Sequence, residues 1–369
     1  MLPKIPLSNS TINIDLKTEI SSIRKDSIHK FEDVLENYFN TENKKVVALN
    51  SGTSAIHLAL ILSGVKKGDE VLCQSFTYIA TVNPVIYQNA TPIFIDSERN
   101  TWNMCPIHLE EAIKDRISKG KKPKAIIVVD LYGMPAKMDK IVSISKKYQI
   151  TLIEDAAEAL GSEYKGKKCG TFGDYGIISF NHNKIISTLG GGALICKSEE
   201  EKNKAIFYAT QAKEKTKHYE HKKIGYNYRM NSLAAIIGLQ QMNNLRQNIK
   251  KRREVYNYYN DFFNKIKGIN LLAEKPNNYF SNRWLSCIEI NELETVVNKE
   301  DIILLLESKN IESRPLWKPL HLQPVFKSLP YYGERVAENL FKKGLCLPSG
   351  SNLKNDDLKR IFSTINKLL

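Results

Sequence analysis

Short apolar runs and amphipathic stretches alternate along the first half of the chain. The apolar runs are rich in Val, Ile and Leu and have the length of strands, and each is followed by a stretch whose apolar residues have helical spacing. The pairs are residues 46–48 with 55–63, 70–73 with 80–88, 92–96 with 109–117, and 125–130 with 138–148, and a last apolar run covers 151–153. This order predicts an α/β fold with a mostly parallel sheet flanked by helices.

The second half of the chain predicts a connecting helix and a smaller domain. Apolar residues keep helical spacing from about Ser232 to Phe263, and the sequence after about Gly268 is typical of an α+β unit. We therefore expect a large domain over residues 1–245, which includes the connecting helix, and a small C-terminal domain over residues 246–369. A chain of 369 residues is long enough for both cores.

The composition predicts a cytoplasmic protein with reduced thiols. No run of about eighteen uncharged apolar residues exists, so no membrane span is expected. The first seven residues lack the long apolar stretch of a signal peptide. The six cysteines form no CxxC pair and have no histidines at ligand spacing, so we expect no metal site and no disulfides.

The net charge of +14 raises the question of a polyanionic partner. Pairs such as Lys222-Lys223 and Arg252-Arg253 are spread along the chain and interrupted by other residue types, without a zinc-finger, basic-zipper or aromatic RNA-binding pattern. We therefore expect no nucleic-acid partner, although a basic nucleic-acid-binding protein is the alternative. A positive field also favours a small anionic substrate that carries phosphates.

Two apolar runs end beside residues that can carry chemistry, an acid and a lysine. Asp155 follows the run 151–153, and open α/β sheets bind their ligands at the carboxyl ends of strands. Lys184 follows a second run, 176–180. A lysine among apolar neighbours can lose its proton and attack a carbonyl, and an aspartate can hold a pyridine nitrogen protonated. The pair indicates pyridoxal phosphate (PLP) chemistry, with Lys184 as the Schiff-base lysine and Asp155 as the partner of the ring nitrogen.

Both residues also have an ordinary structural role open to them. Most lysines are solvated surface charges. The neighbours of Lys184 are not typical of a solvent-exposed segment, since they include Phe180, Ile185 and the glycine run 190–192. Asp155 would also cap a helix that starts directly after it, and this role is compatible with binding a ring.

Small residues at the first strand-to-helix junction predict an anion site. The segment 50–55 leads directly into a helix, where free N–H groups and the hydroxyls of Thr53 and Ser54 can bind a phosphate. A plain capped helix is the alternative. Tyr78, after the second strand, either stacks on a flat heterocycle or packs in the core. A phosphate cup, an aromatic ring, an acid and a lysine at successive strand ends predict one shared site.

Five segments resemble the sugar-nucleotide aminotransferases of the DegT/DnrJ/StrS group, which are fold type I, aspartate-aminotransferase-like PLP enzymes. They are residues 51–55, 68–71, 155–158, 179–184 and 225–230, and the similarity extends from about residue 31 onward. The resemblance implies a large PLP domain with a mostly parallel sheet and a smaller C-terminal α+β domain. Segments 101–104, 313–324 and 345–353 resemble a narrower branch, which aminates C4 of a UDP-linked 4-keto-6-deoxy-N-acetylglucosamine in the bacillosamine pathway.

The resemblance also implies roles for single residues. Lys184 would form the Schiff base, Asp155 would pair with the pyridine nitrogen, Glu158 would lie near the 3-hydroxyl, and Tyr78 would cover the ring face. The implied phosphate ligands are Thr53, Ser54, Ser179 and, from the neighbouring subunit, Asn227. Such sharing implies a homodimer with shared active sites.

Three residues are weaker candidates for the nucleotide-sugar side of the site. They are Arg229, Trp317 and His321, and each has a structural alternative: an ion pair, small-domain core and a hydrogen-bonded structural histidine, respectively. The implied reaction transfers an amino group from L-glutamate to the keto sugar, with Lys184 shuttling a proton. Amination at C3, and a GDP- or dTDP-linked sugar, stay open.

Two further alternatives share the scaffold. A PLP-dependent sugar dehydratase of this group characteristically has histidine at the position of Lys184, and a non-catalytic PLP-binding regulator would add a DNA-binding module, which the sequence does not show. Residues 1–30 are shorter than the usual start of the family and lack its glycine-bearing turn. This departure bears on sugar specificity.

Overall fold

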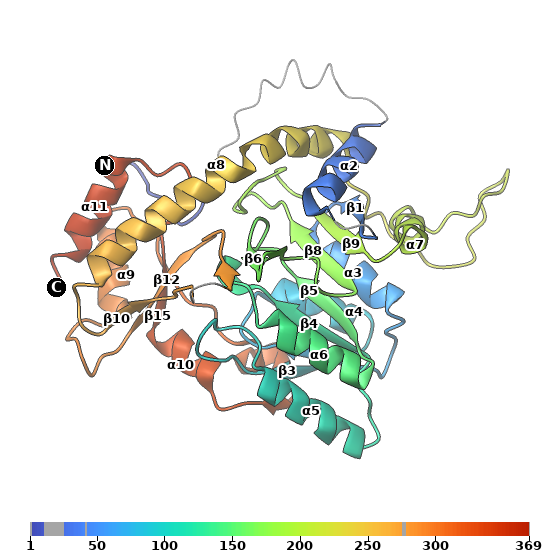
Figure 1. Ribbon diagram of the computed structural model, residues 1–369, viewed down its shortest axis with the longest axis horizontal. Coiled ribbons are helices and arrows are strands. Elements are labelled where there is room, and N and C mark those ends of the chain that lie inside the picture. Colours follow the sequence, from blue (N-terminus) through green and yellow to red (C-terminus); the bar gives the residue numbers. More distant parts are fainter. Residues whose placement is uncertain (1, 11–25, 41–42, 275–277, 369) are drawn as a thin grey trace.

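The computed structural model describes residues 2–10, 26–40, 43–274 and 278–368, and its largest element is an eight-stranded sheet (Figure 1). The strands are β1 (Lys45–Leu49), β2 (Glu70–Gln74), β3 (Thr91–Ile95), β4 (Ala125–Val129), β5 (Thr151–Asp155), β8 (Tyr175–Ser179), β9 (Gly192–Cys196) and β14 (Tyr331–Tyr332). Their order is β1-β9-β8-β5-β4-β2-β3-β14. Neighbours from β8 to β14 are parallel, while β9 is antiparallel to both of its neighbours. The predicted mostly parallel sheet is confirmed.

Helices cover both faces of this sheet. One face carries α3 (Gly52–Leu62), α4 (Asn83–Tyr87) and α7 (Glu199–Ala209). The other face carries α2 (Ser27–Phe39), α5 (Pro106–Ser118), α6 (Met138–Tyr148) and the first half of α8 (Ser232–Phe263). Successive strand residues alternate between the two cores: Val71 packs with α3 and α4, and Leu72 packs with α5 and α6.

The helix predicted over residues 80–88 is broken in the structure. A 3₁₀ turn, η1 (Ile79–Thr81), precedes the short α4, and Pro84 lies in the first turn of α4. Proline has no N–H to donate and disfavours a helical conformation of the residue before it, so a continuous helix through this position is disfavoured.

A second, antiparallel sheet forms the core of the C-terminal part. Its strands are β10 (Ile269–Leu271), β12 (Ser286–Ile290), β15 (Gly344–Leu347) and β13 (Arg314–Pro315), in that order. The helices α9 (Lys299–Ser308) and α11 (Asn355–Ile365) pack in the same core, and α10 (Val336–Lys343) packs near β12 and β15. The remaining elements are β6 (Glu163–Tyr164), β7 (Lys167–Lys168) and β11 (Tyr279–Phe280), which form a small sheet, and the 3₁₀ turns η2 (Leu131–Gly133), η3 (Leu320–Leu322) and η4 (Pro324–Phe326).

Helix α8 joins the two cores, as the predicted connecting helix should. Asn231 caps it by accepting a hydrogen bond from Ala234 N at 2.8 Å. Gly238 lets α2 approach closely, because a Cβ at this position would lie 2.5 Å from the ring of Phe31. Tyr259, near the other end of α8, is fully buried in the C-terminal core.

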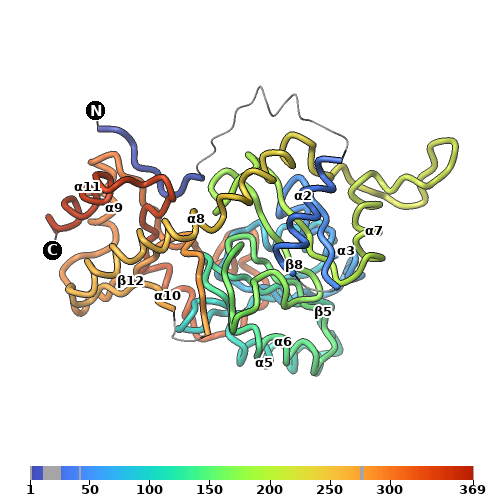
Figure 2. The backbone as a smooth tube through the Cα atoms, turned by 45° about the horizontal axis from the view of Figure 1, so that its top comes forward, coloured from blue at the N-terminus to red at the C-terminus, as the bar shows by residue number. Residues whose placement is uncertain are grey.

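The division at residues 245 and 246 stays a prediction. It falls inside α8, and two segments cross it. Ile5 pairs with Ile311 and packs in the C-terminal core, so the N-terminal segment lies beside the last part of the chain (Figure 2). Strand β14 pairs with β3 of the large sheet.

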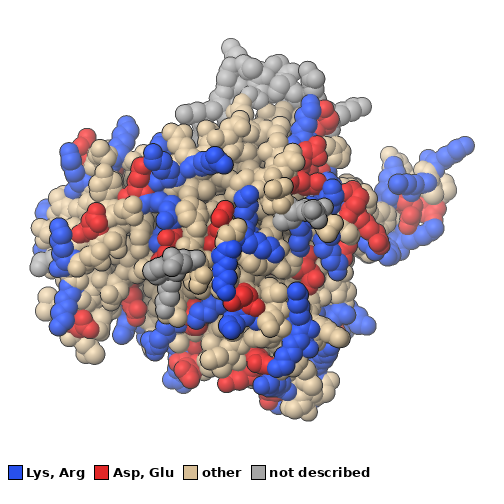
Figure 3. Space-filling model, in the orientation of Figure 1, with Lys and Arg blue, Asp and Glu red and all other residues tan. Residues whose placement is uncertain are grey.

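Three expectations from composition can be compared with the described residues. None of their helices is both long enough and apolar enough to span a bilayer. All six cysteines are buried and none is paired in a disulfide in the structure, while their reduced state stays a prediction. Lys and Arg are interleaved with Asp and Glu over the face drawn in Figure 3. The expected absence of a glycine-bearing turn falls largely on residues 11–25, which lie outside the described residues.

Candidate active site

A cavity of about 590 Å³ lies where the carboxyl ends of the large-sheet strands meet the four-stranded antiparallel sheet of the C-terminal part. The large sheet contributes the segments that follow β1, β2, β5 and β8, and the C-terminal part contributes residues from segments at β12, β13 and β15. The predicted site residues that line it are Thr53, Tyr78, Asp155, Glu158, Ser179, Lys184 and Trp317. The structure therefore brings the predicted acid, lysine, aromatic ring and part of the phosphate cup together.

Asp155 is the last residue of β5 and is 4% exposed. Its Oδ2 accepts a hydrogen bond from Thr81 Oγ1 at 2.8 Å, and its Oδ1 accepts one from Ala157 N at 3.2 Å. Burial raises the pKa of Asp155, while these hydrogen bonds and the charge of Lys184 act to lower it. A cation beside the carboxylate would favour its ionised form, which is what a protonated pyridine nitrogen offers.

The helix expected directly after Asp155 is wrong. The segment forms successive turns, with Ala159 N bonded to Ala156 O and Ser162 N bonded to Ala159 O. The side-chain amide of Asn282 donates to the carbonyls of Glu158 and Leu160, so these carbonyls are bonded to the C-terminal part of the chain. Tertiary hydrogen bonds thus replace the helical ones, and they hold Glu158 toward the cavity.

Lys184 lies between a carboxylate and an indole ring. Its Nζ is 3.3 Å from Glu158 Oε1 and 4.3 Å from the centre of the Trp284 ring. Burial raises the pKa of Glu158 to about 7, against the opposing charge of Lys184 and a hydrogen bond from Tyr132 N. A carboxyl group that titrates near neutral pH beside an amine can exchange a proton with it.

The N-terminal segment holds the loop that carries Lys184. Ser8 Oγ donates to Asn183 O at 2.9 Å, and Ser10 Oγ donates to Lys184 O. The indole N–H of Trp284 donates to the same Asn183 carbonyl at 2.7 Å. The backbone around the lysine is therefore fixed by two segments that are far from it in sequence.

The predicted anion cup is formed at the start of α3. Ser51 caps the helix by accepting a hydrogen bond from Ser54 N at 3.0 Å, and Ala55 N donates to Ser51 O. The N–H groups of Gly52 and Thr53, at the start of the first turn, have no intrahelical partner. Thr53 and Ser179 line the cavity beside it. Ser54 does not line the cavity: its hydroxyl donates to Asn50 Oδ1 at 2.6 Å and so supports the cup from behind.

Aromatic rings line the side of the cavity that faces the C-terminal part. Tyr78 is 59% exposed, and its ring centre lies 5.6 Å from that of Trp317. The backbone N–H of Trp317 donates to the hydroxyl of Tyr132 at 3.0 Å. Tyr78 is thus not buried in the core, which was its structural alternative.

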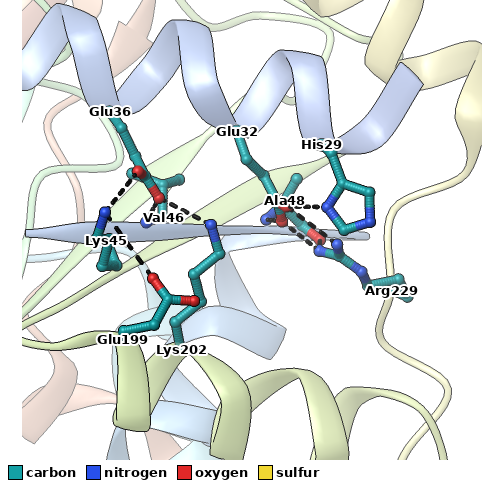
Figure 4. A network of polar contacts seen from close by, with 9 residues as sticks. All are labelled: His29, Glu32, Glu36, Lys45, Val46, Ala48, Glu199, Lys202 and Arg229. Atoms are coloured by element: carbon teal, nitrogen blue, oxygen red, sulfur yellow. Dashed lines mark hydrogen bonds and ion pairs between the residues drawn. The ribbon is translucent and has the colours of Figure 1, made fainter. Parts of the chain in front are cut away.

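Arg229 lies away from the cavity, in the network drawn in Figure 4. Its guanidinium forms a bidentate ion pair with the fully buried Glu32 of α2, with Nη2 3.1 Å from Oε2, and it donates to Ala48 O at 2.9 Å. Glu32 also accepts from Ala48 N. The pair fastens α2 to β1, so within this chain Arg229 has the ion-pair role that was its structural alternative.

His321 and Asn227 also do not line the cavity. The ring of His321 is hydrogen-bonded to Ser75 Oγ at 2.6 Å and stacks on Tyr331, and burial lowers its pKa. The carbonyl of Asn227 accepts a hydrogen bond from the side chain of Asn50, which does line the cavity. Substrate contact by His321 and phosphate contact by Asn227 stay predictions.

Several residues of the cavity were not predicted from the sequence, among them Thr81, Trp284, Glu312 and Arg314. Thr81 lies in a stretch that predicted a plain helix, and its polar side chain among apolar residues was the one local signal. Glu312 pairs with Arg314 at 2.9 Å and accepts from Leu7 N at 3.2 Å, and no sequence spacing indicates such contacts.

A second cluster of titratable side chains lies at the carboxyl ends of β4 and β5. Asp130, Glu154 and Cys169 are buried close enough together to hold a metal ion. Both oxygens of Glu154 are already bonded, to the backbone N–H groups of residues 170, 172 and 173. Burial raises the pKa of both carboxyl groups, so the pair holds a proton more tightly than isolated acids would.

The residues present fit PLP. The cavity offers a buried carboxylate, an amine of low exposure, a helix N-terminus for a phosphate and an exposed ring for stacking. Its base is closely packed, because a Cβ on Gly192 would lie 2.4 Å from the backbone N of Gly52. Only a residue without a side chain lets β9 approach the cup in this way.

Comparison with known proteins gives the same assignment. The model of the DegT/DnrJ/EryC1/StrS aminotransferase family matches residues 15–366. EpsN of Bacillus subtilis (strain 168), named as an inferred pyridoxal phosphate-dependent aminotransferase, is 47% identical over 326 residues, which are 87% of this chain and 83% of that protein. GDP-perosamine synthase of Escherichia coli O157:H7 is 36% identical over 358 residues, which are 96% of this chain and 94% of that protein.

A solved structure shares the fold. It is the crystal structure of a DegT DnrJ EryC1 StrS aminotransferase from Brucella abortus, with a TM-score of 0.87 and 29% identity, and the match covers 95% of this chain and 94% of that one. This likeness confirms the predicted α/β fold of PLP-type aminotransferases.

Proposed function

Because the chain belongs to the DegT/DnrJ/EryC1/StrS aminotransferase family, we propose that it moves an amino group from L-glutamate to C4 of a UDP-linked 2-acetamido-2,6-dideoxy-4-keto-hexose. The chain is a PLP-dependent sugar aminotransferase; the amino donor, the nucleotide and the ring position are the proposal. One observation carries it: segments 313–324 and 345–353, whose sequences resemble the C4 branch, contribute Arg314, Trp317 and Cys346 to the cavity wall.

Bound PLP supplies an electron sink that stabilises negative charge on the carbon that loses a proton. The residues of this chain prepare the site for that chemistry. Asp155 offers a buried carboxylate to a ring nitrogen, and Thr81 holds that carboxylate in place. The first turn of α3 binds the phosphate through its N–H groups.

Lys184 and Glu158 move the proton. Nζ of Lys184 takes a proton from the donor carbon and returns it at the other reacting carbon, and Glu158, 3.3 Å away, accepts or supplies a proton as the amine changes its charge. The ring of Trp284 stabilises the ammonium form, since a cation over an aromatic face is attracted to it.

The proposed active unit is a homodimer with shared sites. In a single chain Asn227 does not line its own cavity. It lies in the segment between α7 and α8, whose outer part projects from the body of the molecule (Figure 1) and offers a surface for a neighbouring subunit. A cytoplasmic location remains part of the same proposal.

A GDP-linked 4-keto sugar is the second candidate substrate. It is favoured by the 36% identity with GDP-perosamine synthase, over nearly the whole of both chains. The two candidates differ in the base and in the sugar, while the cavity residues that serve the amino transfer are the same for both.

An amino-transfer assay with a panel of substrates tests the proposal. The holoenzyme is incubated with L-glutamate and UDP-, GDP- or dTDP-linked 3-keto and 4-keto sugars, and products are identified by mass and NMR. We expect 2-oxoglutarate release and a 4-amino sugar from the UDP substrate. Conversion of the GDP sugar alone, or of 3-keto sugars alone, would reject the proposed substrate while leaving the aminotransferase activity in place.

Lys184→Ala is the variant that tests the mechanism. It should lower turnover by more than about 10²-fold, the smaller end of what a positioned proton-transfer group contributes. Lys197→Ala, which removes an exposed lysine paired with Glu201, is the matched control and should retain full activity. Full activity in the Lys184 variant would show that the proton is moved by another group.

A further inference from the structure

Two cysteines face each other across neighbouring strands at the edge of the cavity. Cys287 of β12 and Cys346 of β15 are directly opposite in the antiparallel register. Each is 1% exposed, and their sulfur atoms are 3.7 Å apart. The remaining described cysteines have no such contact with another sulfur.

The backbone pattern shows which kind of cross-strand pair this is. The carbonyl of Cys287 accepts a hydrogen bond from Leu272 N, so it points toward the β10 side and away from β15. The carbonyl of Gly344 accepts from Leu316 N on the β13 side, and by alternation Cys346 has the same orientation. The two cysteines are therefore a non-hydrogen-bonded pair, whose Cα atoms are about 4.5 Å apart in antiparallel sheets. Disulfides span Cα distances from about 4.4 Å upward, so the bond can form without separating the strands.

One member of the pair is open to small molecules. Cys346 lines the cavity, whereas Cys287 lies behind it among Trp284, Tyr132 and other core residues. A reagent of the size of water or peroxide can thus reach the first sulfur without unfolding the strands. The second sulfur is already in contact with the first.

We propose that Cys287 and Cys346 are a reversible oxidation site, in which a peroxide joins the two sulfurs in a disulfide. The Cys346 sulfur attacks one oxygen of hydrogen peroxide, the O–O bond breaks, and the thiol proton leaves with the departing oxygen as water. The Cys287 sulfur then displaces the remaining hydroxyl from Cys346, and its proton leaves with that hydroxyl as a second water. Two thiols are oxidised and one peroxide is reduced, so the step needs no other reactant.

The same geometry predicts a slow and reversible reaction. Burial raises the pKa of the Cys287 thiol, so little of the thiolate that must displace the hydroxyl from Cys346 is present, and this second step is slow. Closing the sulfurs from 3.7 Å to a bond length of about 2.0 Å moves the Cys346 sulfur, which lines the same cavity as Trp317. We therefore expect the oxidised enzyme to bind its sugar substrate less well, and a dithiol reductant to restore it.

Peptide mapping of the intact holoenzyme tests the site directly. The protein is treated with hydrogen peroxide, remaining thiols are alkylated, and the digest is analysed by mass spectrometry without reduction. We expect one linked peptide that joins Cys287 to Cys346 and disappears after dithiothreitol. Absence of this peptide while other cysteines become oxidised would overturn the proposal.

Activity after the same treatment tests the consequence. Wild-type enzyme should show a raised KM for the sugar substrate that dithiothreitol reverses, and Cys346→Ser, which lacks the sulfur that attacks the peroxide, should have the same KM with and without peroxide treatment. Cys105→Ser, which removes a buried cysteine at the start of α5, is the matched control and should respond like wild type. A peroxide-dependent rise in the KM of the Cys346 variant equal to that of wild type would show that the pair is not the sensitive site. The peptide map is read on wild-type protein, so it decides the chemistry even if a variant does not fold.

Discussion

The protonation state of Glu158 affects both the charge of the cavity and the stability of the fold. It is 5% exposed and carries a pKa raised to about 7 by burial, so it holds its proton well above the usual range of a glutamate. Its partner Lys184 is the proposed Schiff-base lysine, and Tyr132 N donates a hydrogen bond to the second oxygen of Glu158. A group of this kind serves proton transfer near neutral pH at a cost in stability.

Glu158→Gln should flatten the pH dependence of stability in the cofactor-free protein. Below pH 4.5, its ordinary value, the carboxyl is protonated in both the folded and unfolded states. Between that value and about 7 the unfolded chain releases the proton and the folded chain keeps it, so stability falls as pH rises. A shift of this size corresponds to about 3 kcal/mol.

Urea unfolding at several pH values between 4.5 and 8 measures this contribution. The quantity compared is the difference between wild type and the Gln variant, because Asp155, Asp130 and Glu154 also have raised pKa values and remain in both proteins. We expect the difference to grow in favour of the variant toward pH 7. A constant difference across this window would show that Glu158 titrates as an ordinary glutamate.

The residues that the sequence predicted share one property, which is their place at a strand end. Asp155 and Ser179 are the last residues of β5 and β8, Thr53 lies in the first turn of the helix after β1, and parallel strands bring their carboxyl ends to one edge. Trp284, just before β12, and Arg314, in the two-residue strand β13, reach the same cavity from the second core, where the runs are too short for periodicity to predict the direction of a side chain. Their positions depend on how the two cores meet, and strand order alone does not contain that information.

At the scale of elements, β9 and α3 form the phosphate cup through close backbone contact. The sequence predicted the cup from its small residues, but it did not show that Gly192 packs against Ser51 and Gly52. The broken helix near Pro84 is a similar case: helical spacing was present, and the proline changed the local geometry around Thr81. In the first case a contact between two elements determines the local geometry, and in the second a single proline does. The spacing of apolar residues shows neither effect.

Gly192→Ala should weaken cofactor binding. The added Cβ would lie 2.4 Å from Gly52 N and from the carbonyl carbon of Ser51, so the cup must shift. An extra methyl group forced into a packed site costs about 1–3 kcal/mol. If that strain falls on the cup, affinity for PLP should drop by about tenfold or more, since 1.4 kcal/mol corresponds to a factor of about ten.

Spectroscopic titration of the cofactor-free variant with PLP measures that affinity. Gly166→Ala is the control, because its turn has a positive φ of 74° but its Cβ would meet nothing within 4 Å. It should lose about 1 kcal/mol of stability through backbone strain and keep the affinity of wild type. Wild-type affinity in the Gly192 variant would mean that the cup is not the phosphate site.

For the whole molecule, the N-terminal segment and α8 bind the two cores into one site. Arg252 of α8 is fully buried and donates to Trp284 O, Ser349 O and Ser8 Oγ, so one side chain links the helix, the second core and the segment that holds the lysine loop. Burial lowers the pKa of Arg252 to about 9. Three acceptors that are distant in sequence meet at this side chain. In the sequence, Arg252-Arg253 is only one of several dispersed basic pairs, and nothing in that pattern predicts that Arg252 is buried.

A mixed dimer tests whether two chains share each site. Lys184→Ala removes the amine from its own cavity, and Asn227→Ala removes the side chain that we assign to the partner's phosphate cup. In a hybrid of the two variants one cavity lacks both groups and the other has both intact. Random mixing makes half of the dimers hybrids, so about a quarter of the wild-type sites should be restored.

The measurement compares the activity of the two variants alone with that of the co-expressed mixture at limiting PLP. Each variant alone should be strongly impaired, the first in proton transfer and the second in cofactor affinity, and the mixture should exceed the mean of the two. Activity equal to that mean would place both residues in the same chain's site. Because Asn227 does not line the cavity of its own chain, that outcome would require the segment between α7 and α8 to refold onto the cup.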